Sequence, residues 1–145
     1  MVDRIQIATA VLVRDGLVLA AHRNSVRHAY PDCWAFVGGH VEPGEEPQQA
    51  VRRECLEEVG VQIHDHVPIP MTVSDPALHM HGFLVTHWAG EPVNAAPEEH
   101  DDLRWFRPHE LADLRMAHPE SLPSILNAVE VSRSGLRSGF RGRPR

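Results

Sequence analysis

The chain has 145 residues, of which 42% are hydrophobic and 23% charged, the proportions of one globular domain. No run approaches the ~20 apolar residues of a membrane helix, and the first residues lack the layout of a signal peptide. Two cysteines are too few for a disulfide framework. We therefore expect a cytoplasmic protein with no membrane partner. The net charge is −6, and residues 1–131 combine all 20 acidic residues with nine of the 14 arginines. This acidic body does not attract nucleic acid through its field, so contact with phosphate groups would require metal ions held by carboxylates.

The predicted elements follow the order strands, helix, strands, helix, which indicates an α/β (α+β) fold. Apolar, β-branched runs flank Asp15-Gly16, a strong hairpin turn, and Gly60 ends a helix that begins with acids and a proline at 45–47. We predict strands at 5–14, 17–23, 33–37, within 61–73, at 78–88 and at 103–106, and helices at 45–60, 108–114 and 122–131. Residues 1–131 are expected to form one domain, followed by an arginine-rich, disordered tail at 132–145.

Three glutamates crowd one face of the central helix, because Glu54, Glu57 and Glu58 stand at i, i+3 and i+4. Like charges at this spacing destabilise a helix, and a divalent cation offsets the repulsion more fully than the adjacent Arg52 and Arg53 do. Mg²⁺ prefers carboxylate oxygens and often bridges them to phosphates. From the glutamates alone, a solvated acidic helix face explains the pattern equally well.

The spacing of the surrounding residues favours the metal site. The segment resembles the Nudix box, the loop–helix–loop signature of Nudix hydrolases, at every specified position: Gly39, Glu45, Arg53, Glu54, Glu57, Glu58 and Gly60, with Cys55 and Val61 in the apolar slots. The resemblance covers most of residues 4 to 131 and includes the Trp-x-Gly-Glu-Pro segment at 88–92. One departure is Val37, where many relatives have proline; this change removes no metal ligand.

The resemblance implies a Nudix-type α/β/α sandwich with a mixed β-sheet and the Nudix-box helix. It also implies hydrolysis of a diphosphate linked to another moiety, with Mg²⁺ or Mn²⁺ as cofactor, because metal ions neutralise the diphosphate and orient the attacking water. The implied roles are metal ligation by Gly38, Glu54, Glu57 and Glu58, orientation of the carboxylates by Arg53 with Glu45 as its partner, and backbone freedom at Gly39 and Gly60. For Glu45, a helix N-terminal acid is the alternative.

Relatives of the MutT type place a further acid in the loop before the last strand. Four acids occupy this loop, Glu98, Glu99, Asp101 and Asp102, with His100 between them. Counted from the Gly-Glu-Pro segment at 90–92, the register favours Asp101 as the catalytic acid. Glu98 and Glu99 remain rivals for this role, and Glu99 is also predicted as a metal ligand. For any one of the four, a solvated loop acid is the alternative.

The resemblance suggests three substrate contacts. Arg23 matches a MutT-like arginine near the substrate, Trp34 or Phe36 could face the nucleobase, and His118 falls near the position where relatives recognise the purine edge. The alternatives are a surface arginine at 23 and core aromatic residues at 34 and 36. We interpret two His-x-His pairs, 64/66 and 79/81, as solvated strand faces, because no third metal ligand stands at motif spacing.

The predicted activity is hydrolysis of a canonical or oxidised nucleoside triphosphate to the monophosphate and pyrophosphate. The alternatives are an ADP-ribose or nucleotide-sugar pyrophosphatase and a non-catalytic nucleotide sensor. The intact box argues against the sensor, since sensors usually lose box glutamates. The expected partner is a small-molecule nucleotide; a nucleic-acid or acidic partner is considered only for the basic tail, and both a monomer and a homodimer remain open.

Overall fold

A mixed seven-stranded sheet forms the centre of the computed structural model, which describes residues 4–142 and their side chains as far as Arg133. The strands lie in the order β3-β2-β1-β6-β5, with β4 also pairing with β1 and β7 with β2. β1 and β6 are parallel, and the other pairs are antiparallel. The strands are β1 (Ile5–Arg14), β2 (Leu17–Arg23), β3 (Trp34–Ala35), β4 (Val37–His40), β5 (Gln62–Ile69), β6 (Leu78–Ala89) and β7 (His100–Phe106).

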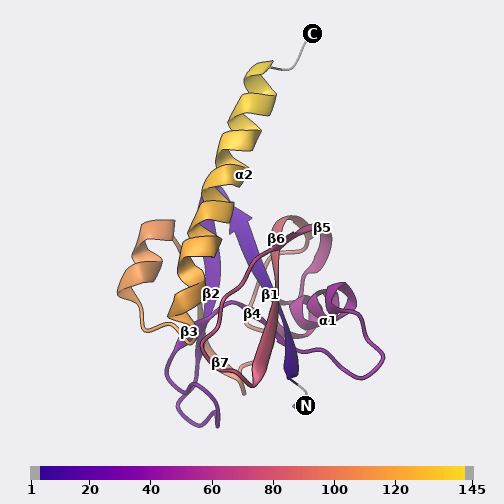
Figure 1. Cartoon of the computed structure of the whole chain (residues 1–145), viewed down its shortest axis with the longest axis vertical. Coiled ribbons are helices and arrows are strands. Elements are labelled where there is room, and N and C mark those ends of the chain that lie inside the picture. The colour runs from indigo at the N-terminus through magenta and orange to yellow at the C-terminus, as the bar shows by residue number, and fades with distance from the viewer. Residues whose placement is uncertain (1–3, 143–145) are drawn as a thin grey trace.

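Two long helices, α1 (Pro47–Val59) and α2 (Leu122–Gly142), cover opposite faces of the sheet (Figure 1). Alternation along β1 explains this arrangement, since successive side chains point to opposite faces. Ala8, Ala10 and Leu12 pack in the core on the α1 side, whereas Val11 and Val13 pack in the core on the α2 side. The predicted α/β/α sandwich with a mixed sheet is confirmed. No helix within residues 4–142 is both long and apolar enough to cross a bilayer.

Local sequence signals fix the predicted turn and helix ends. Asp15 and Gly16 have φ values of 54° and 77°, the left-handed pair of a tight hairpin turn. Glu46 caps α1, where its backbone N–H donates to the Gln49 side chain, and Pro47 occupies the first turn. Gly60 ends the helix at φ 70°, and its N–H donates to the Leu56 carbonyl. The predicted hairpin and box helix are thus confirmed.

The strand predicted at 33–37 is divided in two. Trp34 and Ala35 pair with β2, and after Phe36 the chain changes partner so that Val37 to His40 pair with β1. Gly38 and Gly39 therefore lie inside β4 and not beyond the strand, with Gly38 opposite Thr9. The alternation of apolar residues shows an extended chain but not the change of neighbour.

The last helix is longer than predicted. α2 continues to Gly142, eleven residues beyond the predicted end at Val131, and its last turns extend past the sheet (Figure 1). Arginine has a high helix propensity and no proline occurs between residue 131 and residue 144, so polar composition alone does not end the helix. A domain boundary after residue 131 stays a prediction. Residues 143–145, part of the predicted disordered tail, lie outside the described residues.

Two short 3₁₀ helices, η1 (Pro108–Asp113) and η2 (Pro119–Ser121), connect β7 to α2. The predicted helix at 108–114 is therefore present as a 3₁₀ helix. The chain around η2 lies beside β3, since the Trp34 N–H donates to the Arg115 carbonyl and the Ala117 N–H donates to the Trp34 carbonyl. This pairing brings the segment before α2 to the same end of the sheet as the box loop.

Candidate active site

Arg53 lies at the centre of a network of carboxylates from the box segment. Its Nε and Nη2 donate to the two carboxylate oxygens of Glu45 at 2.9 and 3.0 Å. Its Nη1 donates to Glu54 at 2.8 Å and to Glu57 at 3.1 Å, and Nη2 also reaches the His40 carbonyl at 2.9 Å. The hydrogen bond to Glu45, followed by the hydrogen bond to Glu54, raises the pKa of Arg53. One guanidinium thus holds three carboxylates in a fixed arrangement, including the predicted Glu45–Arg53 contact.

Gly39 leaves the space in which the Glu54 carboxylate lies. A Cβ at position 39 would stand 2.6 Å from Glu54 Oε1 and 2.7 Å from its Cδ, far inside van der Waals contact. The side chain of Glu54 is only 14% exposed, so its carboxylate is largely enclosed by the surrounding protein. Glycine at this position therefore sets the location of one carboxylate against strand β4.

Glu54 and Glu58 form an acidic pair in which Glu58 is buried and Glu54 is half-buried. Glu58 is 3% exposed, and its Oε2 has no hydrogen-bond partner among the described residues. Burial, then the adjacent Glu54 carboxyl, raises the pKa of Glu58, since two negative charges cannot share this desolvated position without a cation. Hydrogen bonding from the Gly38 backbone acts in the opposite direction. An unpaired, buried carboxylate oxygen beside a second carboxylate is suited to a hard divalent ion.

The four predicted metal ligands from the box are not equally placed. Glu58 is buried and Glu54 is half-buried, and Gly38 and Glu57 line the same cavity as Glu54. Glu57 is 57% exposed and turned to Arg53. Within residues 4–142 no three carboxylate, imidazole or thiolate side chains converge closely enough to form a ready-made metal site. Glu54 and Glu58 thus fit the core of such a site, and Glu57 would complete it through a change of side-chain conformation.

A cavity of about 510 Å³ extends from these carboxylates to an aromatic and apolar end. Its walls combine acids with two arginines and several sulfur-containing and aromatic side chains. The predicted site residues in its lining are Arg23, Trp34, Gly38, Gly39, Glu54, Glu57, Glu99 and His118. Other lining residues include Arg27, Tyr30, Phe36, Met71, Met80 and Met116. The cavity therefore has one charged end and one end suited to a flat, apolar group.

The loop of residues 90–99 is bound to the end of the box helix. The Val93 N–H donates to the Val59 carbonyl at 3.0 Å, and the Ala95 N–H donates to the Glu58 carbonyl at 2.8 Å. These bonds satisfy carbonyl groups that the end of α1 leaves free. They bring the acidic loop to the Glu54–Glu58 pair, as the MutT resemblance implies.

Only one of the four loop acids lines the cavity. Glu99 does so, whereas Asp101 lies outside the lining, 54% exposed, with Oδ1 2.7 Å from His22 Nδ1. Asp102 pairs with Arg104 on the strand, and the Glu98 carbonyl accepts a hydrogen bond from Asn24. Strand β7 begins at His100, so successive side chains along it point in alternate directions. A position counted along the loop does not include this alternation. The geometry therefore favours Glu99 over Asp101, against the order that the sequence register gives.

Arg23 lines the cavity but uses several of its donors for the adjacent loop. Its Nε and Nη2 donate to the Ala29 carbonyl at 3.0 and 2.8 Å, and Nε also reaches the Tyr30 carbonyl at 3.2 Å. Burial, followed by the neighbouring positive charge of Arg27, lowers the pKa of Arg23. Arg23 thus lies where a substrate contact is predicted, and its hydrogen bonds also stabilise the loop of residues 24–32.

The two predicted base contacts lie at the apolar end. Trp34 lines the cavity, and its ring also packs edge-on against Phe106, so the same side chain belongs to the cavity wall and to the core. His118 packs edge-on against Tyr30 with ring centroids 4.5 Å apart. Burial lowers the pKa of His118, which favours the neutral ring. Both residues come from segments far apart in sequence and meet through the pairing beside β3.

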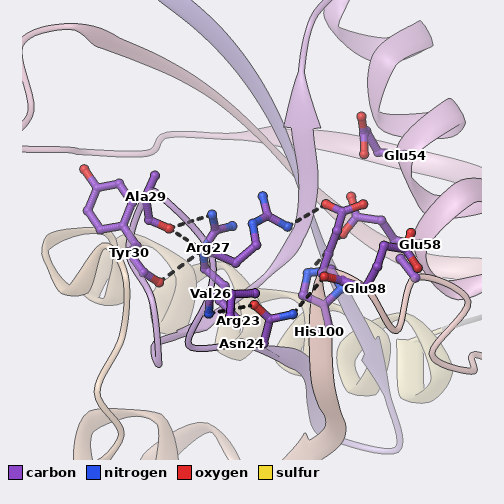
Figure 2. A network of polar contacts seen from close by, with 12 residues as sticks. Arg23, Asn24, Val26, Arg27, Ala29, Tyr30, Glu54, Glu58, Glu98 and His100 are labelled. Atoms are coloured by element: carbon purple, nitrogen blue, oxygen red, sulfur yellow. Dashed lines mark hydrogen bonds and ion pairs between the residues drawn. The ribbon is translucent and has the colours of Figure 1, made fainter.

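Sequence reasoning missed two polar residues of the site. His100 is buried, with Nε2 3.5 Å from Glu58 Oε1, and burial lowers its pKa. Arg27 extends from its loop toward the side on which Glu54 and Glu58 lie, as Figure 2 shows. A histidine within four acids was a visible signal for His100. Nothing in the local sequence distinguishes Arg27, because its partner Glu99 is 72 residues away.

Comparisons with known proteins agree with this geometry. Residues 4–126 match the NUDIX domain. The chain is 32% identical over 124 residues to a CTP pyrophosphohydrolase of Escherichia coli, covering 83% of this chain and 88% of that protein. It is 39% identical over 135 residues to the NAD-capped RNA hydrolase NudC of Stutzerimonas stutzeri, covering 90% of this chain but only 42% of that protein. A MutT Nudix hydrolase structure from Burkholderia pseudomallei superposes with a TM-score of 0.74 at 26% identity, covering 85% of this chain and 98% of that one.

The family match covers the sheet, the box helix and the start of α2, and therefore includes every residue of the carboxylate network. The fold, the box geometry and the sequence similarity all agree on the same assignment. The chain belongs to the Nudix hydrolase family and is a hydrolase of nucleoside diphosphate derivatives.

Proposed function

We propose that the protein hydrolyses a nucleoside triphosphate to the monophosphate and pyrophosphate, with Mg²⁺ or Mn²⁺ as cofactor. The observation that carries this proposal is the single cavity that joins the box carboxylates to an aromatic, apolar end. A nucleoside triphosphate has the same two parts, since its phosphates suit the charged end and its base suits the apolar end. The similarity to a CTP pyrophosphohydrolase supports the same substrate class.

The box residues position the reacting groups in this scheme. When bound, a divalent ion neutralises the diphosphate and orients the attacking water. Glu54 and Glu58 would hold the ion, with Glu57 and the Gly38 carbonyl as further ligands. Arg53 keeps Glu54 and Glu57 in place, and Glu45 in turn fixes Arg53. These residues contribute mainly through preorganisation, which reduces the cost of assembling the transition state.

The attacking water must lose a proton as its oxygen bonds to phosphorus and the bridging P–O bond breaks. Glu99 is the carboxylate outside the box that lines the cavity, so we assign it as a further metal ligand and as the acceptor of this proton. The pyrophosphate leaves as an anion, for which Arg23 and Arg27 in the cavity lining supply positive charge. Asp101, which binds His22 outside the cavity, has no part in this scheme.

The aromatic end is assigned to the nucleobase. Trp34 and Phe36 offer ring surfaces, and the neutral ring of His118 offers one donor and one acceptor. Met71, Met80 and Met116 add flexible apolar surface that adapts to different ring shapes. We therefore expect a preference among bases that is graded and not absolute.

A second candidate is hydrolysis of a diphosphate that joins a nucleoside to another sugar or nucleoside. The 39% identity to an NAD-capped RNA hydrolase favours it, although the chain covers only 42% of that relative. The two candidates differ in their products. A triphosphate yields one nucleoside monophosphate and pyrophosphate, whereas ADP-ribose yields two monophosphates.

The test is a product analysis on the full chain with Mg²⁺. The purified protein is incubated with a panel of ribo- and deoxynucleoside triphosphates, ADP-ribose and NADH, and products are separated by ion-exchange chromatography. We expect monophosphate and pyrophosphate from at least one triphosphate, no turnover in EDTA, and a loss of about 100-fold or more in Glu58→Gln. Turnover of ADP-ribose alone would support the second candidate, and nucleoside diphosphate with orthophosphate would overturn both.

A further inference from the structure

Arg27 and Glu99 form an ion pair across the cavity wall. Arg27 Nη1 donates to Glu99 Oε1 at 2.7 Å, and both residues line the cavity. The two side chains are 27% and 42% exposed, so the pair is partly desolvated yet reachable from the cavity. It joins the loop of residues 24–32 to the loop of residues 90–99. Figure 2 shows Arg27 reaching toward the side on which Glu54 and Glu58 lie.

The two loops do not depend on this ion pair for their contact. The Asn24 side-chain amide donates to the Glu98 carbonyl at 2.8 Å, and the Asn24 N–H donates to the Glu99 carbonyl at 3.1 Å. The Val26 N–H donates to Asn24 Oδ1, which holds the start of the loop in a turn. Backbone and amide contacts thus fix the loops, and Arg27 can change its partner without moving them.

Arg27 also has more free donors than the other arginine of the cavity. Arg23 uses Nε and Nη2 for the Ala29 and Tyr30 carbonyls. Arg27 donates from its side chain only to Glu99 among the described residues. A guanidinium has five N–H groups and binds phosphate oxygens bidentately, so a polyphosphate with several negative oxygens competes well with one carboxylate.

We propose that Arg27 exchanges partners during the reaction, binding a substrate phosphate and thereby releasing Glu99 toward the metal-binding carboxylates. This inference rests on the proposed function, in which Glu99 completes the ligand set. Arg27 is then a phosphate-binding and positioning residue that couples arrival of the substrate to completion of the metal site. Without a polyphosphate, the pair keeps Glu99 from contributing to metal affinity.

The test measures metal binding and kinetics on the full-length protein. Mn²⁺ affinity without nucleotide is measured by calorimetry, and KM and kcat are measured with the best substrate of the panel. The variants are Arg27→Gln, Glu99→Gln and the double change. Arg14→Gln is the matched control, because Arg14 pairs with Glu91 across a similarly long sequence separation but outside the cavity lining.

Two opposite effects are expected from Arg27→Gln. Mn²⁺ should bind about fivefold more tightly, because Glu99 is free, and KM should rise about tenfold with kcat within about threefold of wild type. Glu99→Gln should leave the Mn²⁺ affinity without nucleotide close to that of wild type, because the ion pair already holds Glu99 away from the metal site, and adding Arg27→Gln to it should give no gain. Arg14→Gln should change neither constant. Arg27→Lys, which keeps the charge but not the fork, should keep wild-type Mn²⁺ affinity and raise KM less.

The outcomes separate this inference from the proposed function. If Glu99→Gln keeps full activity, the assignment of Glu99 fails, and the exchange fails with it. If Glu99→Gln loses activity while Arg27→Gln binds Mn²⁺ no more tightly than wild type, the exchange alone is overturned. If Arg27→Gln does not fold, Arg27→Lys serves as the test variant. A wild-type KM together with tighter Mn²⁺ binding in Arg27→Lys would overturn the partner exchange.

Discussion

The carboxylate of Glu54 occupies the space that a side chain on Gly39 would need. The nearest approach is 2.6 Å from a Cβ at position 39 to Glu54 Oε1, and all three of the nearest atoms belong to this one carboxylate. The collision is with the end of a side chain and not with backbone, so the fold can tolerate it by displacing Glu54. Stability and activity should therefore separate at this position.

Gly39→Ala is expected to fold but to lose about 100-fold in kcat/KM, because a displacement of about 1 Å at a metal ligand disrupts the reacting geometry. Gly44→Ala is the control with the opposite pattern. Gly44 has φ 81°, and a Cβ on it would meet no atom within 4 Å, so alanine there should cost about 1 kcal/mol of stability and leave kcat/KM unchanged. Thermal melts and steady-state kinetics on both variants check this. Full activity in Gly39→Ala would contradict the role given to Glu54.

Glu58 should make stability depend on pH when metal is removed. Burial and Glu54 raise its pKa, so the folded chain keeps a proton that the unfolded chain loses above the ordinary value of 4.5. The stabilisation is complete below that pH and is lost as pH rises. In EDTA, the free energy of unfolding of wild type should fall by at least about 1 kcal/mol relative to that of Glu58→Gln between about pH 5 and about pH 8.

Denaturant unfolding of both proteins at the two pH values measures this difference, with Glu130→Gln on the exposed side of α2 as the control. Added Mn²⁺ should stabilise wild type more than Glu58→Gln, since the ion replaces the proton between the two carboxylates. Parallel pH dependence in wild type and Glu58→Gln would show that Glu58 ionises normally and would remove the physical argument for a cation there.

The four loop acids should differ in their effect on turnover. Glu99→Gln is expected to lower kcat by more than about tenfold, whereas Glu98→Gln, Asp101→Asn and Asp102→Asn should stay within about threefold. The reason is position, because only Glu99 lines the cavity. Assays at saturating substrate and Mg²⁺ measure the effect. A deep loss in Asp101→Asn alone would restore the assignment that the sequence register favours.

Removal of residues 132–145 should leave turnover of free nucleotides within about twofold of the full chain. Among the α2 side chains that the structure describes, as far as Arg133, those buried in the core are Leu122, Ile125 and Val129, and all three remain after the cut. Kinetics and a thermal melt on the truncated chain test this. A strong loss of kcat with an unchanged melt would show that the basic tail acts on the substrate.

Sequence spacing predicted the parts of the site that are local. Glu45 and Arg53 are eight residues apart, and a loop followed by a capped helix brings them together by itself. The glutamate face and the Gly60 cap likewise follow from helix periodicity and from the left-handed conformation that glycine allows. The hairpin at Asp15-Gly16 is set by the same kind of short-range rule.

The parts that the sequence did not reveal depend on contacts between distant segments. Arg27 meets Glu99 only because β2 and β7 pair so that Arg23 stands opposite His100, with an irregularity in register at that point. The same register turns Asp101 toward His22. The spacing within one loop carries no information about the neighbouring strand β2. For this reason the sequence register favours Asp101 over Glu99. The division of the strand at Phe36 has the same origin in a change of partner strand.

The most direct test of the account follows the oxygen of the attacking water. The protein hydrolyses its preferred nucleoside triphosphate in isotopically labelled water with Mg²⁺, and mass spectrometry locates the label in the products. Attack at the α- or β-phosphorus, supported by the Glu54 and Glu58 site, predicts one labelled oxygen in the nucleoside monophosphate or in pyrophosphate, and about 100-fold less labelled product in the same time when Glu58→Gln replaces wild type. Label in orthophosphate, or equal turnover by Glu58→Gln, would contradict the account.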